Sequence, residues 1–284
     1  MARAMLSAMM IGILAMTAAV PDDGQAGQGA KASRQGAGPV VFIAHDYGYT
    51  GPDRIPAGIT TVEIVNRGQD LHHAQIVKLL AGKTAKEFLS AMKADPAHWP
   101  SWISFVGGPN GIVPGDRTTA TMRLDAGHYL MLCLIPDKKG VPHVMLGMEK
   151  PLTVIPMSTV AFDEPTPDLT ITQRDFHFEI SKPITAGTHT IHVINEGGQP
   201  HEAVVVKLAP GATVKDFVAG FEPNASGPPP GRPVGGLVGL DRGGRGFFTT
   251  TFDPGRYAVL CFFPDQTTGK EHFTQGMISE FTVK

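Results

Sequence analysis

Four side chains that can bind a soft metal ion occur twice in this chain, in the same order and at nearly the same spacing. Each set has a histidine, a cysteine, a second histidine and a methionine, and the second set lies 128 or 129 positions after the first. A duplicated sequence can keep its scaffold while losing individual side chains, so the survival of all eight indicates a retained chemistry. The two sets are His72, Cys133, His143 and Met148, and His201, Cys261, His272 and Met277.

The donor atoms of each set favour copper. Thiolate and thioether sulfur are soft donors that suit Cu(I), while imidazole nitrogen accommodates either oxidation state. Two histidines, one cysteine and a weak axial methionine can therefore hold copper through a one-electron cycle, and we expect up to two copper ions per chain. Zinc also takes cysteine and histidine, but the methionine argues against it.

Two alternatives to metal binding remain open for the two cysteines. In exported proteins a pair of cysteines most often forms a disulfide. Because Cys133 and Cys261 stand at equivalent positions of the repeat, pairing them would require two equivalent strand ends to meet with their Cα atoms under ~7 Å apart. A buried structural thiol is the other alternative, because free cysteine packs like a small hydrophobic side chain.

Two asparagines lie near the first histidine of each set. Asn66 and Asn195 each stand six residues before it and could brace the ligand loop from outside the ligand set. The alternative is that each simply favours an Asn-x-Gly turn. His73 adjoins His72, but its counterpart is Glu202, so we expect His73 to face solvent or to support the ligands, and not to bind metal.

The repeat extends over a whole small domain. The segment AGITTVEIVNRGQDLHHAQIVKL matches AGTHTIHVINEGGQPHEAVVVKL, and DAGHYLMLCLIPDKKGVPHVMLGM matches DPGRYAVLCFFPDQTTGKEHFTQGM. A period near 129 is too long for a solenoid repeat and fits a complete domain. We therefore predict two tandem domains, residues 39–157 and 158–284.

The residues before the first domain are predicted to direct export. Residues 1–19 carry Arg3 ahead of an apolar run and end in small residues, which is typical of a secretory signal peptide. The apolar run is shorter than the ~20 residues that a spanning helix needs, so no stable membrane anchor is expected after cleavage. Residues 20–38 are rich in Gly, Ala and Gln, which predicts a flexible leader. The expected location is periplasmic or secreted.

Each domain is predicted to consist of strands with one inserted helix. Segments such as VVFIAH, TTVEIVN, LTITQRDFHFEI and RYAVLCFF are short, rich in β-branched or aromatic residues, and separated by Gly and Pro, as in a β-sandwich. One helix per domain is expected where Thr84 precedes Glu87 by three residues and Thr213 precedes Asp216 by three residues. This spacing is typical of a capping box.

These motifs resemble the cupredoxin family, which includes plastocyanin and azurin, in a tandem two-domain form. The resemblance covers nearly everything after the leader, and the endings HVMLGM and HFTQGM match the plastocyanin-like spacing of histidine and methionine. It implies an all-β fold of two Greek-key sandwiches, with a type 1-like copper in each bound by the eight residues above. The gap from cysteine to the second histidine is longer than in small electron carriers of the family, and it resembles the loop of copper nitrite reductases.

The function expected from these observations is electron transfer with a redox protein partner. A net charge of −2 and the lack of a basic block argue against nucleic acid as a partner.

Two-domain members of the family include oxidases and nitrite reductases that resemble each other in carrying histidines beside the cysteine. Here the flanking residues are apolar, so we expect no enzyme activity. Copper storage or delivery, and a structural sandwich with vestigial sites, remain as alternatives. The oligomeric state cannot be predicted from the sequence. The flanking residues are Leu132, Leu134, Leu260 and Phe262.

Overall fold

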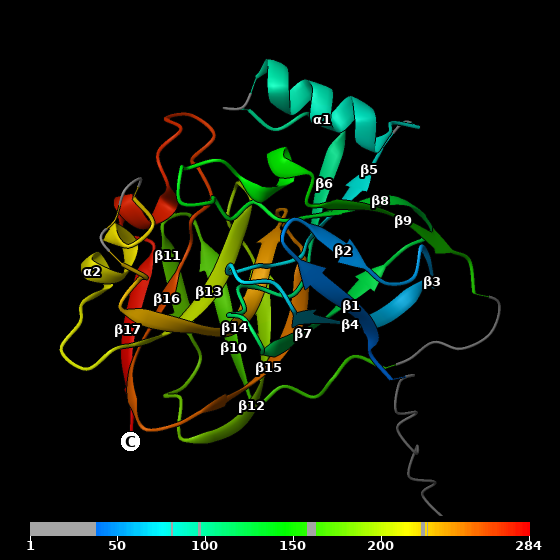
Figure 1. The fold of residues 1–284 in the computed structure, drawn as a ribbon. Helices are drawn as coiled ribbons and strands as arrows, with labels where there is room; N and C mark the ends of the chain where they lie inside the picture. Colours follow the sequence, from blue (N-terminus) through cyan, green and yellow to red (C-terminus); the bar gives the residue numbers. More distant parts are fainter. Residues whose placement is uncertain (1–37, 81, 96–97, 158–162, 223–224, 226) are drawn as a thin grey trace, which may run out of the picture. The chain divides into compact units, whose positions relative to one another are not determined.

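The computed structural model describes residues 38–284, apart from 81, 96–97, 158–162, 223–224 and 226. These residues form two large β-sheets with two short α-helices (Figure 1), which confirms the predicted all-β fold class. The predicted signal peptide, nearly all of the leader and the predicted boundary at residue 158 lie outside the described residues. No helix in the described part of the chain is long and apolar enough to span a bilayer.

The first sheet has eight strands, and both halves of the chain contribute to it. Its spatial order is β11 (His177–Ile180), β10 (Leu169–Arg174), β12 (Gly187–Asn195), β15 (Arg245–Phe252), β7 (Arg117–Leu124), β4 (Gly58–Asn66), β1 (Val40–His45) and β2 (Gly48–Thr50). The pairing of β1 with β4 and that of β10 with β12 are both parallel. The two halves therefore repeat the same local topology.

The second sheet has nine strands and is also shared. Its order is β17 (Ile278–Val283), β16 (Gly255–Leu260), β13 (His201–Leu208), β14 (Gly231–Leu240), β6 (Ile103–Gly107), β5 (Gln75–Leu79), β8 (Gly127–Leu132), β9 (Glu149–Ile155) and β3 (Arg54–Pro56). The helices are α1 (Ala85–Ala94) and α2 (Val214–Ala219), and two 3-10 turns are η1 (His143–Leu146) and η2 (His272–Gln275).

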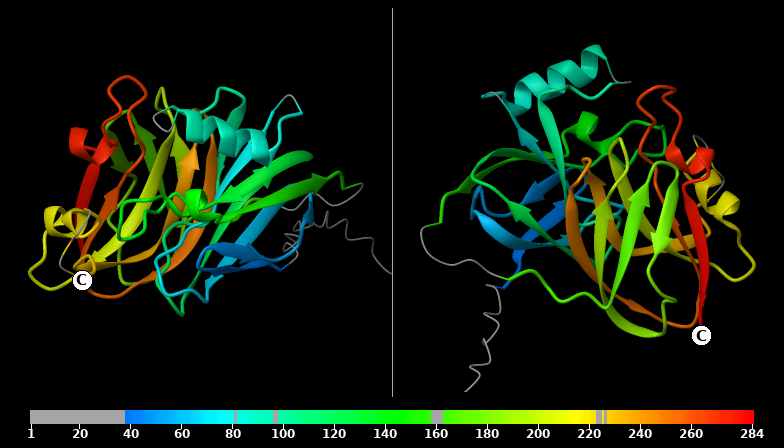
Figure 2. Two further views of the ribbon diagram at one scale, coloured as in Figure 1. Left: turned by 45° about the horizontal axis from the view of Figure 1, so that its top comes forward. Right: turned by 180° about the vertical axis from the view of Figure 1, so that it is seen from behind.

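The two halves join edge to edge within both sheets. In the first sheet β15 pairs with β7 in an antiparallel register, and in the second sheet β14 meets β6 at Leu240 and Val106. Figure 2 shows the strands of the second half, coloured from green through yellow to red, beside the blue to green strands of the first half. One apolar core cluster contains residues from both halves.

Local sequence accounts for most of these elements. The segment VVFIAH is β1 at its predicted bounds, and its residues alternate between the buried and the outer face. Thr84 and Thr213 cap α1 and α2 with complete capping boxes, as predicted. Residues 169–180, expected as one strand, form two strands, β10 and β11. The chain turns between them at Phe176, whose φ of 62° is incompatible with an extended strand.

Candidate metal centres

In each half, the four predicted ligands come from two loops at one end of the sandwich. His72 lies between β4 and β5, Cys133 directly follows β8, His143 begins η1, and Met148 directly precedes β9. Their counterparts take the same places, except that His201 is the first residue of β13. Rigid strands on both sides of each loop thus fix where the donor atoms can lie.

In the first half, two nitrogens and one sulfur converge. The Nδ1 atoms of His72 and His143 are 3.2 Å apart, and Cys133 Sγ is 3.5 Å from His143 Nδ1. All three side chains are almost fully buried, and the three donor atoms lie within 4.8 Å of one another.

The second half repeats this arrangement. The Nδ1 atoms of His201 and His272 are 2.9 Å apart, and Cys261 Sγ is 3.4 Å from His272 Nδ1 and 4.0 Å from His201 Nδ1. These three residues are buried as well, and their donor atoms also lie within 4.8 Å of one another.

These separations fit a common metal ion. Ligand atoms held about 2.0–2.3 Å from one ion in a roughly tetrahedral arrangement are about 3–4 Å from each other. Met148 and Met277 are fully buried, and each is tied by backbone hydrogen bonds to its group. The Met148 N–H donates to His143 O at 2.9 Å, and the Cys133 N–H donates to Met148 O at 3.2 Å. Two imidazoles and a thiol, with a buried methionine tied to them through the backbone, suit copper.

The long loop from cysteine to histidine folds back on itself and does not separate the donors. The His143 N–H donates to Ile135 O at 2.9 Å, and the Val144 N–H donates to Cys133 O at 2.8 Å. Gly147 ends the turn with a φ of 105°, a conformation that favours glycine and returns the chain toward Met148. The second half repeats these bonds from His272 to Phe263 and from Phe273 to Cys261.

The two cysteines are free, buried and in separate groups. Each sulfur faces its own pair of histidines. The disulfide that the sequence left open is therefore not formed in this structure.

Sequence reasoning missed an aspartate that orients the first histidine of each group. Asp46 Oδ1 accepts a hydrogen bond from His72 Nε2 at 2.7 Å, and Asp175 Oδ1 accepts one from His201 Nε2 at 2.8 Å. A proton held on Nε2 leaves the Nδ1 lone pair free for a metal. The signal was present in the repeat, because Asp46 and Asp175 are also 129 positions apart in HDYGY and RDFHF.

The Asn-x-Gly motif supports the loop before the histidine. Asn66 Nδ2 donates to Asp70 O at 2.8 Å and to Ile112 O at 2.9 Å, while its Oδ1 accepts from the Gly68 N–H at 2.9 Å. Asn66 thus makes both the turn and the brace that the sequence left as alternatives. A Cβ on Gly68 would lie 2.7 Å from His72 Nε2, so only glycine fits there.

The second half uses the same motif. Asn195 Nδ2 donates to Gln199 O at 2.9 Å and to Leu240 O at 2.8 Å, and its Oδ1 accepts from the Gly197 N–H at 2.8 Å. A Cβ on Gly197 would lie 2.5 Å from His201 Nε2.

Burial keeps the donors of both groups uncharged when no metal is bound. Desolvation lowers the pKa of His143 and that of His272 to about 4. Desolvation also raises the pKa of the Cys133 thiol to about 12 and shifts the pKa of Cys261 in the same direction. The imidazoles can therefore offer lone pairs at neutral pH, whereas a metal must displace a proton from each thiol.

The surroundings of the two sulfur atoms differ. His73 is buried, which corrects the expectation that it could face solvent, and its Nε2 accepts from the Leu134 N–H at 2.8 Å. In the second half Glu202 takes this role, and its Oε1 accepts from the Phe262 N–H at 3.0 Å. Desolvation lowers the pKa of His73 to about 3 and raises the pKa of Glu202 to about 7.

A second difference concerns the residue beside the thiol. The Tyr49 hydroxyl lies against Cys133, where it lowers the thiol pKa in opposition to the larger effect of burial. The same hydroxyl donates to the His73 carbonyl. The counterpart of Tyr49 is Phe178, which is buried and carries no hydroxyl.

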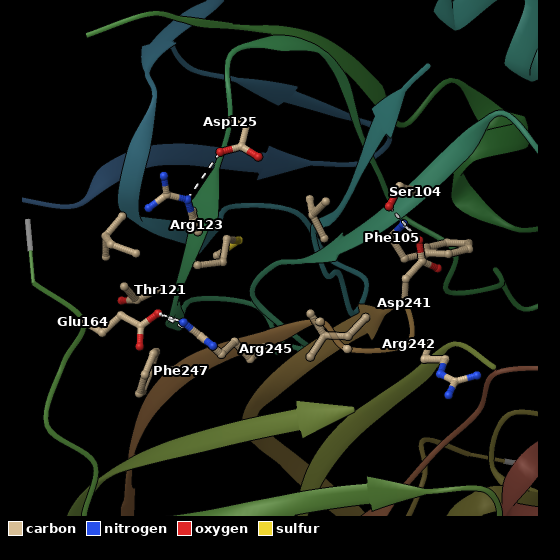
Figure 3. Close-up of a pocket in the computed structure, with 16 residues that line it drawn as sticks. Ser104, Phe105, Thr121, Arg123, Asp125, Glu164, Asp241, Arg242, Arg245 and Phe247 are labelled. Carbon is tan, nitrogen blue, oxygen red and sulfur yellow. Dashed lines mark hydrogen bonds and ion pairs between the residues drawn. The ribbon is translucent and has the colours of Figure 1, made fainter. Parts of the chain in front are cut away.

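A pocket of about 390 Å³ lies away from both donor groups. Figure 3 shows Arg123 directed at Asp125 and Arg245 directed at Glu164, with N···O distances of 3.4 and 2.9 Å. No histidine or cysteine is among the described residues that line this pocket. Both signs of charge line this pocket, and two of its arginines are paired with carboxylates.

Comparisons with known proteins find similar structures but no matching family model and no matching curated protein. The reduced auracyanin of Roseiflexus castenholzii is 21% identical, with a TM-score of 0.31, and the match covers 43% of this chain and 100% of that one. A blue copper oxidase from Nitrosomonas europaea is 14% identical, with a TM-score of 0.26, over 86% and 84% of the two chains.

A copper-containing nitrite reductase from Thermus scotoductus SA-01 is also similar. It is 11% identical, with a TM-score of 0.25, and the match covers 86% of this chain and 61% of that one.

Proposed function

We propose that this chain is an exported copper protein with two mononuclear type 1-like sites, and that it transfers electrons. The observation that carries this proposal is the duplicated group of two Nδ1 atoms and one Sγ atom, converging within 4.8 Å and buried in both halves. Export rests on the N-terminal sequence pattern, and a redox protein partner is part of the same proposal.

The residues divide the work of such a site between them. The two histidines and the cysteine would hold the ion, and the methionine would supply a weak thioether donor. Bound copper would supply a one-electron couple. Asp46 and Asp175 hold the first histidines in one orientation and tautomer, so that the donors need not rearrange when the charge changes. Burial of the group excludes water and keeps the set of donors constant.

Copper loading tests the proposal. Reconstituted and desalted protein is expected to retain close to two equivalents of copper per chain. It should also show thiolate-to-copper absorption and an EPR signal of mononuclear Cu(II). A stoichiometry that stays below one, with both thiols free, would contradict the assignment. Competition with zinc under the same conditions checks the preference for copper that the methionines predict.

We further propose that the chain is not an oxidase or a nitrite reductase. Catalytic copper chemistry requires a metal position with its own ligands that is open to substrate. The residues on either side of Cys133 and Cys261 are apolar, so no histidine adjoins either cysteine. Turnover of oxygen or nitrite by the copper-loaded protein, at rates above those of the Cys133→Ser, Cys261→Ser double variant, would contradict this proposal.

A further inference from the structure

One buried polar residue of the first half reaches the candidate metal centre of the second half. Asn110 follows β6 in the first half and is 2% exposed. Its Nδ2 donates to Glu202 Oε2 at 3.3 Å and to Ala203 O at 3.4 Å. Its Oδ1 accepts from the Gly111 N–H at 2.6 Å. Asn110 therefore contacts the residue that directly follows His201.

Glu202 in turn holds the backbone beside the cysteine. It is 5% exposed, and its Oε1 accepts from the N–H of Phe262, the residue after Cys261. The backbone N–H of Glu202 also donates to Cys261 Sγ at 3.4 Å. A displacement of Glu202 would therefore shift the N–H that donates to Cys261 Sγ. It would also shift the backbone next to Cys261.

The loop that carries Asn110 also supports the first centre. Ile112 and His72 exchange two backbone hydrogen bonds, of 2.8 and 3.2 Å. The Ala74 N–H donates to Pro109 O at 2.9 Å, and the Asn110 N–H donates to Gly236 O at 3.4 Å. Residues 108–112 are thus tied to the first histidine of the first group and to a strand of the second half.

The opposite contact is not available to the second half. The residue at the position equivalent to Asn110 is Val238, in the matching segments GGPNGI and GGLVGL. Its side chain has no polar atom and cannot donate to His73, the counterpart of Glu202. At this position, therefore, the second centre depends on a side chain of the first half, but the first centre does not depend on the equivalent side chain of the second half.

We propose that Asn110 is a positioning residue of the second metal centre. By holding Glu202, it makes the geometry at Cys261 depend on the loop 108–112 of the first half, while the first centre has no such dependence on Val238. The copper signals that test this proposal rest on the proposed function. Thiol labelling of the metal-free protein, the second measurement, does not.

The experiment replaces Asn110 by its counterpart residue and reads each centre by itself. Asn110→Val is combined with Cys133→Ser, so that only the second centre reports, and with Cys261→Ser, so that only the first does. We expect the reduction potential and the thiolate-to-copper absorption of the second centre to shift and those of the first to stay unchanged. Val238→Ala is the matched control and should move neither signal of the first centre.

The metal-free protein supplies the independent readout. In the same two backgrounds the remaining thiol is labelled with a thiol reagent, whose access to a buried sulfur requires local opening. Asn110→Val should speed labelling of Cys261 several-fold and leave labelling of Cys133 unchanged. If no copper binds but this selective effect appears, the proposed function fails and the positioning role stands.

Three outcomes would overturn the proposal. They are an unchanged second centre in both readouts, equal acceleration of both thiols, and a shift confined to the first centre. Should Asn110→Val not fold, Asn110→Ser keeps a small polar side chain that is too short to reach Glu202, and it should give the same selective pattern. In a Glu202→His background, which copies His73, the effect of Asn110→Val should vanish, and an undiminished effect would also contradict the proposal.

Discussion

The two halves place the same ligands in the same order but surround the two sulfur atoms differently. The histidines, the cysteine, the aspartate behind the first histidine and the Asn-x-Gly turn are all repeated. Beside the sulfur, Tyr49 and His73 of the first half correspond to Phe178 and Glu202 of the second. The candidate metal donors and the groups that orient them are thus shared, whereas the groups beside the sulfur differ. Two centres with one ligand set should therefore differ in reduction potential.

The largest expected effect is the loss of one centre at a time. Cys133→Ser and Cys261→Ser should each abolish the thiolate-to-copper absorption of its own centre and leave the other, because each sulfur faces only its own histidines. The two losses should add up to the parent spectrum, as expected for separate sites. Absorption and EPR of the two variants check this, and loss of both signals in one folded variant would show that the centres are not separate.

The metal-free protein should respond to pH in opposite ways at Glu202 and His73. The raised pKa of Glu202 gives stability that is present below its ordinary pKa of 4.5 and is lost as pH rises through about 7. The lowered pKa of His73 gives stability that is present above 6.5 and is lost as pH falls toward about 3.

Urea denaturation of the metal-free variants measures this contrast. Relative to the parent, Glu202→Gln should gain stability between pH 4.5 and 8, by on the order of 3 kcal/mol, because it avoids a buried negative charge. His73→Gln is the matched variant, and its free energy of unfolding should instead rise relative to that of the parent as pH falls from 6.5 to 4. If both variants tracked the parent across this range, the two buried groups would not be titrating as described.

Removing the aspartate behind the first histidine should weaken binding without removing the centre. Asp46→Ala and Asp175→Ala each free His72 or His201 to rotate and to change tautomer. Loss of such a partner costs about 10–100-fold in metal affinity. Competition with a copper chelator measures each affinity in the background of the other cysteine variant. Because both carboxylates make the same contact, the two losses should be similar, and affinities equal to the parent's would show that the aspartates do not orient the ligands.

The two candidate methionine ligands, Met148 and Met277, should affect the reduction potential more than copper binding. Met148→Leu and Met277→Leu should keep copper bound and make the reduction potential more positive, because a weak thioether donor stabilises Cu(II) slightly. Voltammetry of each variant, with the other centre inactivated by its cysteine substitution, isolates the effect. An unchanged potential and spectrum in either centre would mean that its methionine is not a ligand.

The smallest expected effect is confined to the first centre. Tyr49→Phe installs the residue type found at the equivalent position of the second half. Removing a hydroxyl that lies against Cys133 should lower the reduction potential of the first centre, since a polar group that lowers the thiol pKa also reduces the electron donation of the sulfur to copper. The second centre of the same protein serves as the control. If the reduction potential of the first centre stayed the same, Tyr49 would not be a cause of the expected difference in potential between the two centres.

Much of this architecture could be predicted because it is local or repeated. The strand at residues 40–45 follows from its alternation of buried and outer side chains, and the helix start at Thr84 from its capping box. The break between β10 and β11 was missed, because the β-forming residues on both sides of Asp175 hide the turn at Phe176. Strand propensity depends on neighbouring residues in the sequence. It cannot show that the chain must turn here for Asp175 to reach His201.

The sequence by itself determined the donor set, its duplication and the strand-rich character of both halves. These features depend on residue type and spacing, which any reader of the chain can compare between its two parts. The tertiary structure decided which partners complete the centres, because those contacts join residues far apart in sequence. Asp46 orients His72 from the turn between β1 and β2, and Asn110 of one half holds Glu202 of the other. The aspartate recurs at the repeat spacing but its partner cannot be read from that spacing, and Asn110 has no polar counterpart in the second half. Each contact arises only when the fold brings the two side chains within hydrogen-bond distance.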